Sequence, residues 1–141
     1  MKPIVDTFVR VAPDCPAAYG IVPVSKGERK TLHEIQYELL AEHPYRYTLE
    51  DLIVETHIRH KLADEPIDEA RRAEVRAELL RKDHPCMRAS VLPKKLGWGV
   101  HYDEAGRIAL YPMESERYAE FLERTDLKQE PAMRNAKAVK G

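Results

Sequence analysis

Cysteine, glycine and net charge are all scarce in this sequence, and each scarcity excludes a class of protein. The 141 residues include two cysteines, Cys15 and Cys86, which are too few for a fold held together by disulfides. Six glycines leave no Gly-rich linker that would divide two domains. The formal net charge of −1 gives no overall field toward nucleic acid or an acidic membrane, so we expect neither as a partner.

Long apolar runs and a secretory signal are also missing. No run approaches the roughly 20 apolar residues that a membrane-spanning helix needs. Asp6 and Arg10 stand where a signal peptide would carry its apolar region. Without such a signal we expect reduced thiols, and we therefore predict a cytoplasmic protein.

What the chain does contain predicts one domain over residues 1–141. Hydrophobic residues make up 43% of the sequence and charged residues 33%, a balance typical of a folded and well-solvated protein. A chain of this length buries roughly two-thirds of its unfolded surface, so it can fold without a metal or a disulfide. The sequence itself requires no cofactor.

Hydrophobic periodicity predicts an α+β fold: an antiparallel sheet of about four to five strands with three to four helices packed on it. The expected helices begin at Thr31, at Thr48, near Pro66 and near Ser115, where capping residues or proline precede an apolar stripe. Alternating patterns predict strands in residues 4–12, 87–92, 98–102 and 108–112, and an edge strand after residue 126. The basic end, residues 135–141, is expected to be a disordered tail.

Residues 94–112, KKLGWGVHYDEAGRIALYP, hold three of the six glycines and predict a β-hairpin. A phosphate-binding loop would lead into a helix N-terminus, whereas a strand follows here. DEAG fits a three-residue hairpin loop with Gly106 in the left-handed conformation. In this register Gly99 lies opposite Tyr111, whose ring is expected to cover the bare backbone.

Aromatic and basic side chains on the hairpin and in two His-Pro segments form the candidate ligand site. If the second face of the hairpin is open, His101, Tyr111 and Arg88 would line a pocket for an anionic or aromatic small ligand. If a helix covers that face, the same residues are structural. The full candidate set is Arg88, Trp98, His101, Tyr111, Tyr45 and Arg46. Such residues also stack on single-stranded nucleic acid, but the chain has neither an RNP nor a KH motif.

ETHIRHK places His57 and His60 three residues apart on a helix, so both could face one metal site. Zinc or a similar metal would need further ligands, and His84 and Cys86 in DHPC are the candidates. The chain carries neither an HExxH motif nor a CxxC pair, and the alternative is one packed histidine and one at the surface. Cys86 with His84 could also act as nucleophile and base, the alternative being an inert, buried thiol.

Three blocks of sequence carry a resemblance to a known family: DTFVRVAPDCP, KTLHEIQYELLAEHPYRYTLEDLIVETHIRHK and PCMRASVLPKKLGWGVHYDEAGRIALYPMESERY, with AMR near the end. Together they resemble a family of small, mainly bacterial proteins that is catalogued as a domain of unknown function. The resemblance extends from Asp6 to Arg134. It implies a self-contained domain, and it carries over no activity, cofactor or catalytic residue.

These observations favour a non-catalytic binding module for a small ligand or a protein partner. The alternative is a small enzyme with a site centred on histidine and cysteine, with or without a metal. Convergence of His57, His60, His84 and Cys86 would favour the enzyme, and an open face at His101 would favour the binding module. A sheet edge or a seam on the second helix could support a homodimer, which the sequence leaves open.

Overall fold

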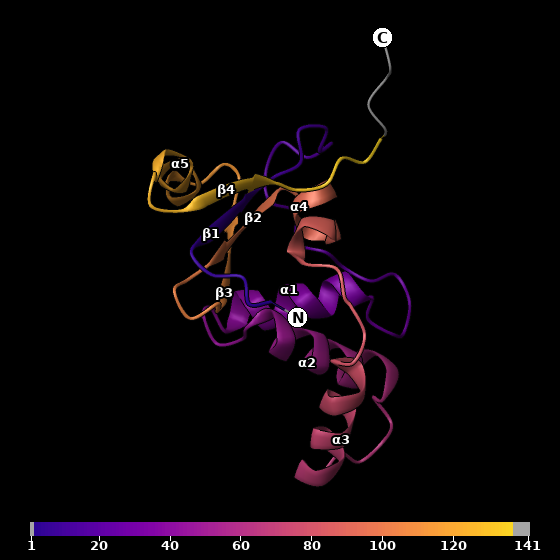
Figure 1. Ribbon diagram of the computed structural model, residues 1–141. Coiled ribbons are helices and arrows are strands. Elements are labelled where there is room, and N and C mark those ends of the chain that lie inside the picture. Colours follow the sequence, from indigo (N-terminus) through magenta and orange to yellow (C-terminus); the bar gives the residue numbers. More distant parts are fainter. Residues whose placement is uncertain (1, 137–141) are drawn as a thin grey trace.

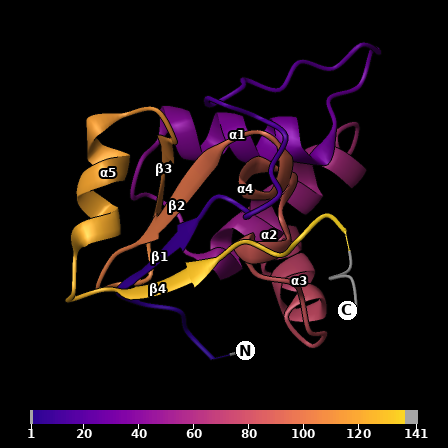
Figure 2. The same ribbon diagram turned by 90° about the horizontal axis from the view of Figure 1, so that it is seen from above.

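The structure is a computed structural model that describes residues 2–136, and it shows a four-stranded open sheet with helices on both faces (Figures 1 and 2). The strands lie side by side in the order β3-β2-β1-β4. Their bounds are Thr7–Arg10 for β1, Trp98–Tyr102 for β2, Ile108–Pro112 for β3 and Lys128–Pro131 for β4. The predicted α+β class is confirmed.

The sheet is mixed, so the expectation of a purely antiparallel sheet is wrong. β1 and β3 each pair with β2 in antiparallel orientation, but β4 pairs with β1 in parallel, with Phe8 opposite Gln129. The reason lies in the connection from β3 to β4. Helix α5 (Glu116–Glu123) carries the chain across one face of the sheet, so β4 enters at the opposite edge in the direction of β3 and therefore of β1.

All four expected helices are confirmed, and a fifth is present in the described residues. Thr31 caps α1, accepting a hydrogen bond from the Glu34 amide, and Thr48 with Asp51 forms the capping box of α2. The remaining helix bounds are Leu32–Glu42 for α1, Leu49–Lys61 for α2, Glu69–Leu79 for α3 and Val91–Lys95 for α4. None of the helices within residues 2–136 is long and apolar enough to cross a membrane.

The fifth helix replaces the strand that alternation predicted at residues 87–92. There the chain forms a 3-10 turn, η1 (Met87–Ala89), and then the short helix α4. Ser90 caps α4, since its hydroxyl accepts from the Leu92 amide at 3.2 Å, and Pro93 is tolerated because a first-turn amide needs no partner inside the helix. Met87 and Leu92 are both buried in the core, although five residues apart they would lie on opposite faces of a strand.

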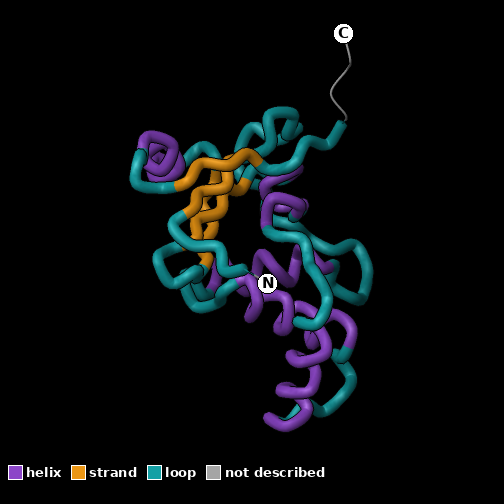
Figure 3. The backbone as a smooth tube through the Cα atoms, viewed as in Figure 1, coloured by secondary structure: helices purple, strands orange, loops and turns teal. Residues whose placement is uncertain are grey.

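Two hydrophobic clusters occupy the two faces of the sheet. On β1, Val9 points into the larger cluster with α1, α2 and α4, and Phe8 points into the smaller one beneath α5. Figure 3 shows the long loop between β1 and α1, which is secured where Trp98 Nε1 donates to the carbonyl of Ile21 at 2.8 Å. The sheet is therefore covered on both faces, and α5 alone supplies the helical cover of the second face.

Helix α3 packs chiefly on α2, away from the sheet (Figure 1). Its contact is a small cluster of Val54 and Ile58 from α2 with Val75 from α3. Ala70, Ala73 and Ala77 of this helix are exposed, and the larger Val75 and Leu79 define its buried side. Burial of one valine leaves α3 weakly anchored compared with the other long helices.

Near the C-terminus the Asp14 carboxylate accepts hydrogen bonds from the backbone amides of Asn135 and Ala136, each at 3.0 Å. The rest of the tail that was expected to be disordered, residues 137–141, lies outside the described residues. Cys15 and Cys86 are both free thiols.

Candidate functional site

The hairpin of residues 98–112 has the predicted register. Gly99 pairs with Tyr111 and His101 with Ala109, so all four residues share the second face of the sheet. Gly106 has a φ of +79°, and the Asp103 carboxylate accepts from the amides of Ala105 and Arg107 to close the turn. Gly106 thus serves the turn of the hairpin, and Gly97, with a φ of +77°, serves the bend just before it.

Helix α5 covers the His101 and Tyr111 face. The Phe121 ring lies 4.5 Å from the imidazole of His101 and 4.8 Å from the ring of Tyr111, measured between centroids. His101 is only 7% exposed. Gly99 is covered chiefly by Phe8 and by Tyr118 of α5, in place of the expected cover by Tyr111. The structural interpretation of this face, a hairpin covered by a helix, is the one that the structure supports.

Tyr45 joins His101 and Tyr111 from the loop between α1 and α2. Its hydroxyl lies 2.7 Å from Nδ1 of His101 and 2.7 Å from the hydroxyl of Tyr111. The backbone of Tyr45 has a φ of +59°, which costs a non-glycine residue roughly 1–2 kcal/mol. Its amide donates to the carbonyl of Ile108 on β3 at 2.9 Å, so the strained residue is held at the sheet edge.

This cluster is electrically neutral. Burial lowers the pKa of His101. The pKa of Tyr45 is raised, chiefly by burial and secondly by the hydrogen bond with Tyr111. If Tyr111 donates to Tyr45, and Tyr45 donates to Nδ1 of a neutral His101, every hydroxyl proton within the three residues has an acceptor. Such a network fixes the loop on the sheet, and it leaves no basic group free for chemistry.

The other three candidate ligand residues lie elsewhere. Trp98 faces the main core, where it packs on Tyr37 at 5.1 Å between ring centroids. Arg88 Nε donates to the carbonyl of Pro131 at 2.8 Å and so fastens the end of β4. Arg46 is exposed and lies over the ring of Tyr47. Of the six candidates the structure therefore brings together three: Tyr45, His101 and Tyr111.

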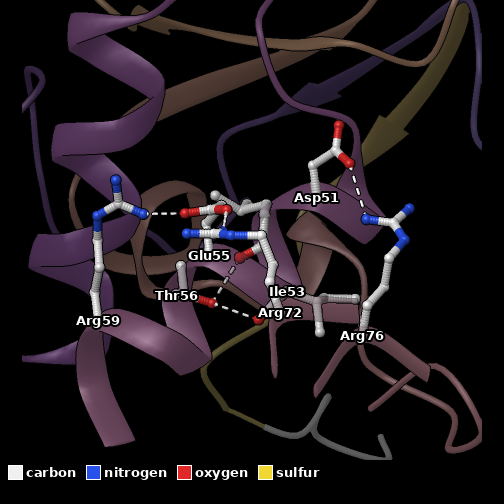
Figure 4. A network of polar contacts seen from close by, with 8 residues as sticks. Asp51, Ile53, Glu55, Thr56, Arg59, Arg72 and Arg76 are labelled. Atoms are coloured by element: carbon white, nitrogen blue, oxygen red, sulfur yellow. Dashed lines mark hydrogen bonds and ion pairs between the residues drawn. The ribbon is translucent and has the colours of Figure 1, made fainter. Parts of the chain in front are cut away.

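Arg46 also lines a cavity of about 520 Å³ between α2 and α3. Figure 4 shows the ion pairs at its wall, where Glu55 contacts both Arg59 and Arg72 and the Asp51 carboxylate accepts from Arg76 at 3.1 Å. Because these charges pair across the two helices, the cavity carries little uncompensated charge. The ion pairs at the wall of this cavity hold α3 on α2.

A different pair of cavities gathers the candidate metal ligands. The inner cavity holds about 170 Å³ and the outer about 440 Å³, and they share five lining residues from α1, α2 and the segment before η1. We call the two together the histidine groove. Its lining residues are Leu32, His33, Gln36, Leu49, Leu52, Ile53, Thr56, His57, His60, Lys61, Leu79, His84, Pro85, Cys86, Met87, Ala89, Ser90 and Val91.

The polar side chains that line the histidine groove are of a restricted kind. Four of the chain's six histidines line it, together with Lys61 and Cys86, and no carboxylate among the described residues does so. The Ser90 hydroxyl donates to Oε1 of Gln36 at 2.9 Å, which leaves the amide NH₂ of Gln36 as a donor. Thr56 donates its own hydroxyl proton to the carbonyl of Leu52 at 2.7 Å.

His57 and His84 differ in their surroundings. Burial lowers the pKa of His57, and the neighbouring charges of Lys61, His60, Arg71 and His84 lower it further. Nε2 of His84 donates to the carbonyl of Leu79 at 2.6 Å, which fixes its tautomer when the ring is neutral. The groove is therefore lined by imidazole rings and by one ammonium group, that of Lys61.

The four candidate metal ligands share the groove without converging. His57, His60 and His84 line the outer cavity, and Cys86 lines the inner one. Residues 2–136 contain no group of three or more His, Cys, Asp or Glu side chains placed to hold a metal ion. The groove offers its imidazoles separately, as hydrogen-bonding groups.

The sequence pointed to three histidines of the groove, His57, His60 and His84. It did not point to His33 or to the other neighbours Leu32, Gln36 and Lys61. A signal for the position of the groove exists on α2, whose apolar stripe of Leu49, Leu52, Ile53 and Thr56 is continued by His60 at helical spacing. The buried end of that stripe packs in the core, and its polar end opens into the groove. Where the residues of an apolar stripe become polar along one helix, the helix therefore passes from the core to the wall of a cavity.

No curated protein and no solved structure shows a significant match to this chain. A sequence model described as "family of unknown function (DUF6157)" matches residues 2–138. That match covers nearly the whole chain and confirms the resemblance read from its three blocks. The chain therefore belongs to DUF6157, a family of unknown function.

Proposed function

We propose that this protein is a binding module for a small molecule and that the ligand occupies the histidine groove. The observation that carries the proposal is the continuity of the two cavities, which share Leu32, Gln36, Ile53, Thr56 and Pro85. Ligand-binding pockets commonly hold about 300–1,000 Å³, and the outer cavity alone holds about 440 Å³.

The composition of the groove supports the same proposal. Binding sites for small molecules are mostly apolar with a few polar groups that fix orientation. Leu32, Ile53, Leu79 and Pro85 supply the apolar wall of the outer cavity, and the imidazoles and Gln36 supply the polar groups. Leu32 is 45% exposed at this wall, which is apolar surface that a ligand would cover.

A catalytic role for the same groove has weaker support. Cys86 lines the inner cavity, but Nε2 of His84 is already bound to the Leu79 carbonyl. A nucleophile needs a base within hydrogen-bonding reach, and a catalytic metal needs about three protein ligands that converge. The arrangement fits recognition better than covalent chemistry.

The experiment is a fragment screen by two-dimensional NMR on the isotope-labelled chain. The library contains small aromatic carboxylates, phosphate monoesters, amides and amines, with Zn²⁺ in a separate titration. We expect hits to perturb the amides of Gln36, Ile53 and His60 and to lose affinity in Ile53→Trp, which fills the groove. Leu122→Trp, at an exposed position on α5, is the matched control and should leave binding unchanged.

Three outcomes would count against the proposal. Hits that map to α5 or to the α2–α3 cavity would place the site elsewhere. Equal loss of affinity in Ile53→Trp and Leu122→Trp would show a general loss of folding. Stoichiometric Zn²⁺ binding that is abolished by His57→Gln, with no organic hit, would favour the metal-assisted enzyme instead.

A further inference from the structure

We infer that the ligand of the histidine groove is a small amphipathic anion, with a carboxylate or phosphate head and an apolar body. The inference rests on the proposed function, because it names the chemical class of the ligand in that groove. It comes from the chemistry of the lining residues, which combine N–H donors and one ammonium group with an apolar surface and include no carboxylate among the described residues.

The donors lie on α1 and α2. The amide NH₂ of Gln36 is free to donate, because Ser90 already occupies its oxygen. Lys61 ends α2 as an exposed ammonium group at the outer cavity. His57 and His60 each carry at least one ring N–H, and they lie one turn apart on the same helix face. An anionic head bound here would accept charge-assisted hydrogen bonds.

The absence of competing carboxylates strengthens the argument. The chain has 24 acidic residues, yet none among residues 2–136 lines either cavity of the groove. Where acids do occur nearby, they lie in other contacts: Glu78 lines the adjoining cavity with Arg71, Arg81 and Lys82. A cationic ligand would therefore find no counter-charge in the groove, whereas an anionic one would find the ammonium group of Lys61 and the N–H donors of the imidazoles and Gln36.

The apolar body is required by the apolar part of the lining. Leu32 and Ile53 line both cavities, and the inner cavity continues along Leu49, Leu52, Met87 and Val91. A bare inorganic anion would leave this surface exposed to water, whereas a ring or a short alkyl chain would bury it and so bind more tightly. The inner cavity of about 170 Å³ sets the scale of that body.

The test is a calorimetric titration of matched probes on the full chain. Benzoate, benzamide and benzylammonium share one ring and differ in charge, and phenyl phosphate supplies the second anionic head. Acetate and inorganic phosphate supply the heads without the ring. We expect benzoate or phenyl phosphate to bind at least about tenfold more tightly than benzamide, and benzylammonium to bind most weakly. The tighter of the two anions identifies the head group.

Two variants test the role of charge. Lys61→Gln should weaken benzoate about five- to tenfold and leave benzamide unchanged. Arg59→Gln removes an equal charge two residues away, but Arg59 pairs with Glu55 on the α2–α3 side of the helix, so its benzoate affinity should match that of the original protein. Leu32→Ser should weaken all ring-bearing probes to a similar degree, because they share the apolar body.

The outcomes separate this inference from the proposed function. Equal affinity for benzoate and benzamide, both reduced by Leu32→Ser, would overturn the anionic class while the groove remained a ligand site. Equal weakening of benzoate by Lys61→Gln and Arg59→Gln would also overturn it, because only long-range charge would then be acting. Failure of every probe to bind would overturn the proposed function as well.

Discussion

The hydroxyl of Tyr45 lies 2.7 Å from Nδ1 of His101, and these two atoms join a loop to the face of the sheet that α5 covers. Tyr45 reaches this position only with a left-handed backbone, at a φ of +59°. The strain is therefore balanced by hydrogen bonds to His101 and Tyr111 and by the backbone contact with Ile108. Tyr45 therefore has a structural role, which is to hold the loop between α1 and α2 on the sheet.

Replacement of Tyr45 by phenylalanine should destabilise the protein by about 1–3 kcal/mol, because it removes two hydrogen bonds and leaves buried Nδ1 of His101 without its partner. Urea denaturation followed by circular dichroism measures the change. Tyr19→Phe is the control: Tyr19 is 60% exposed, and its substitution should change the free energy of unfolding by less than about 0.5 kcal/mol. Equal effects of the two substitutions would show that the network contributes nothing.

The same network predicts how stability depends on pH. Burial holds the pKa of His101 below its ordinary value of 6.5, so the unfolded chain binds the proton more readily than the folded one. The stabilising contribution is complete above about pH 6.5 and declines as the pH falls toward the folded pKa, with a limiting slope of about 1.4 kcal/mol per pH unit. His57 shifts in the same direction and adds to the slope.

Urea denaturation between pH 5.5 and pH 7.5 isolates this contribution, because the aspartates with lowered pKa, Asp14 and Asp126, titrate below that range. His101→Gln should flatten the dependence of the free energy of unfolding on pH, and His57→Gln should flatten the remainder. A slope unchanged by His101→Gln would mean that His101 titrates alike in the folded and unfolded chains.

Gly99 allows α5 to approach the sheet. A Cβ added at this position would lie 2.6 Å from Cε2 of Tyr118 and 2.7 Å from Cζ of Phe8. We therefore expect Gly99→Ala to destabilise the protein by about 1–3 kcal/mol, as overpacked core positions commonly do. Gly27→Ala is the matched control, since no heavy atom lies within 4 Å of its added Cβ. Thermal denaturation of both variants checks the prediction, and a neutral Gly99→Ala would show that α5 can shift to admit a methyl group.

Local sequence signals predicted those parts of the fold that local interactions determine. The capping residues Thr31 and Thr48 located two helices, and the register of the hairpin followed from its turn at Gly106. The segment 87–92 was predicted wrongly because its alternating pattern also fits a 3-10 turn followed by a helix capped by Ser90. The parallel position of β4 depends on where α5 crosses the sheet, a tertiary choice that no local pattern encodes.

In the candidate site, too, the features that local interactions determine were predicted and those that depend on tertiary packing were not. That His57 and His60 share one helix face followed from their spacing, since a helix turn is a local property. That His84 and Gln36 line the same groove depends on how α1 and the segment after α3 pack on α2, which the sequence alone did not reveal. Whether the His101 face is open likewise depended on α5, whose own pattern predicts a helix but not the face it covers.

Val75 is the main apolar anchor of α3, because it is the buried residue of that helix in the cluster with Val54 and Ile58. Val75→Ala should cost about 1–3 kcal/mol locally and should increase hydrogen exchange in α3 far more than in α1. Ala77→Ser is the control at an exposed position of the same helix and should leave exchange unchanged. Because Leu79 lines the histidine groove from the end of α3, Val75→Ala should also weaken ligand binding there. If exchange instead rises equally in α1 and α3, the two helices unfold as one unit, and the ion pairs of Glu55 and Asp51 hold α3 more firmly than its single buried valine does.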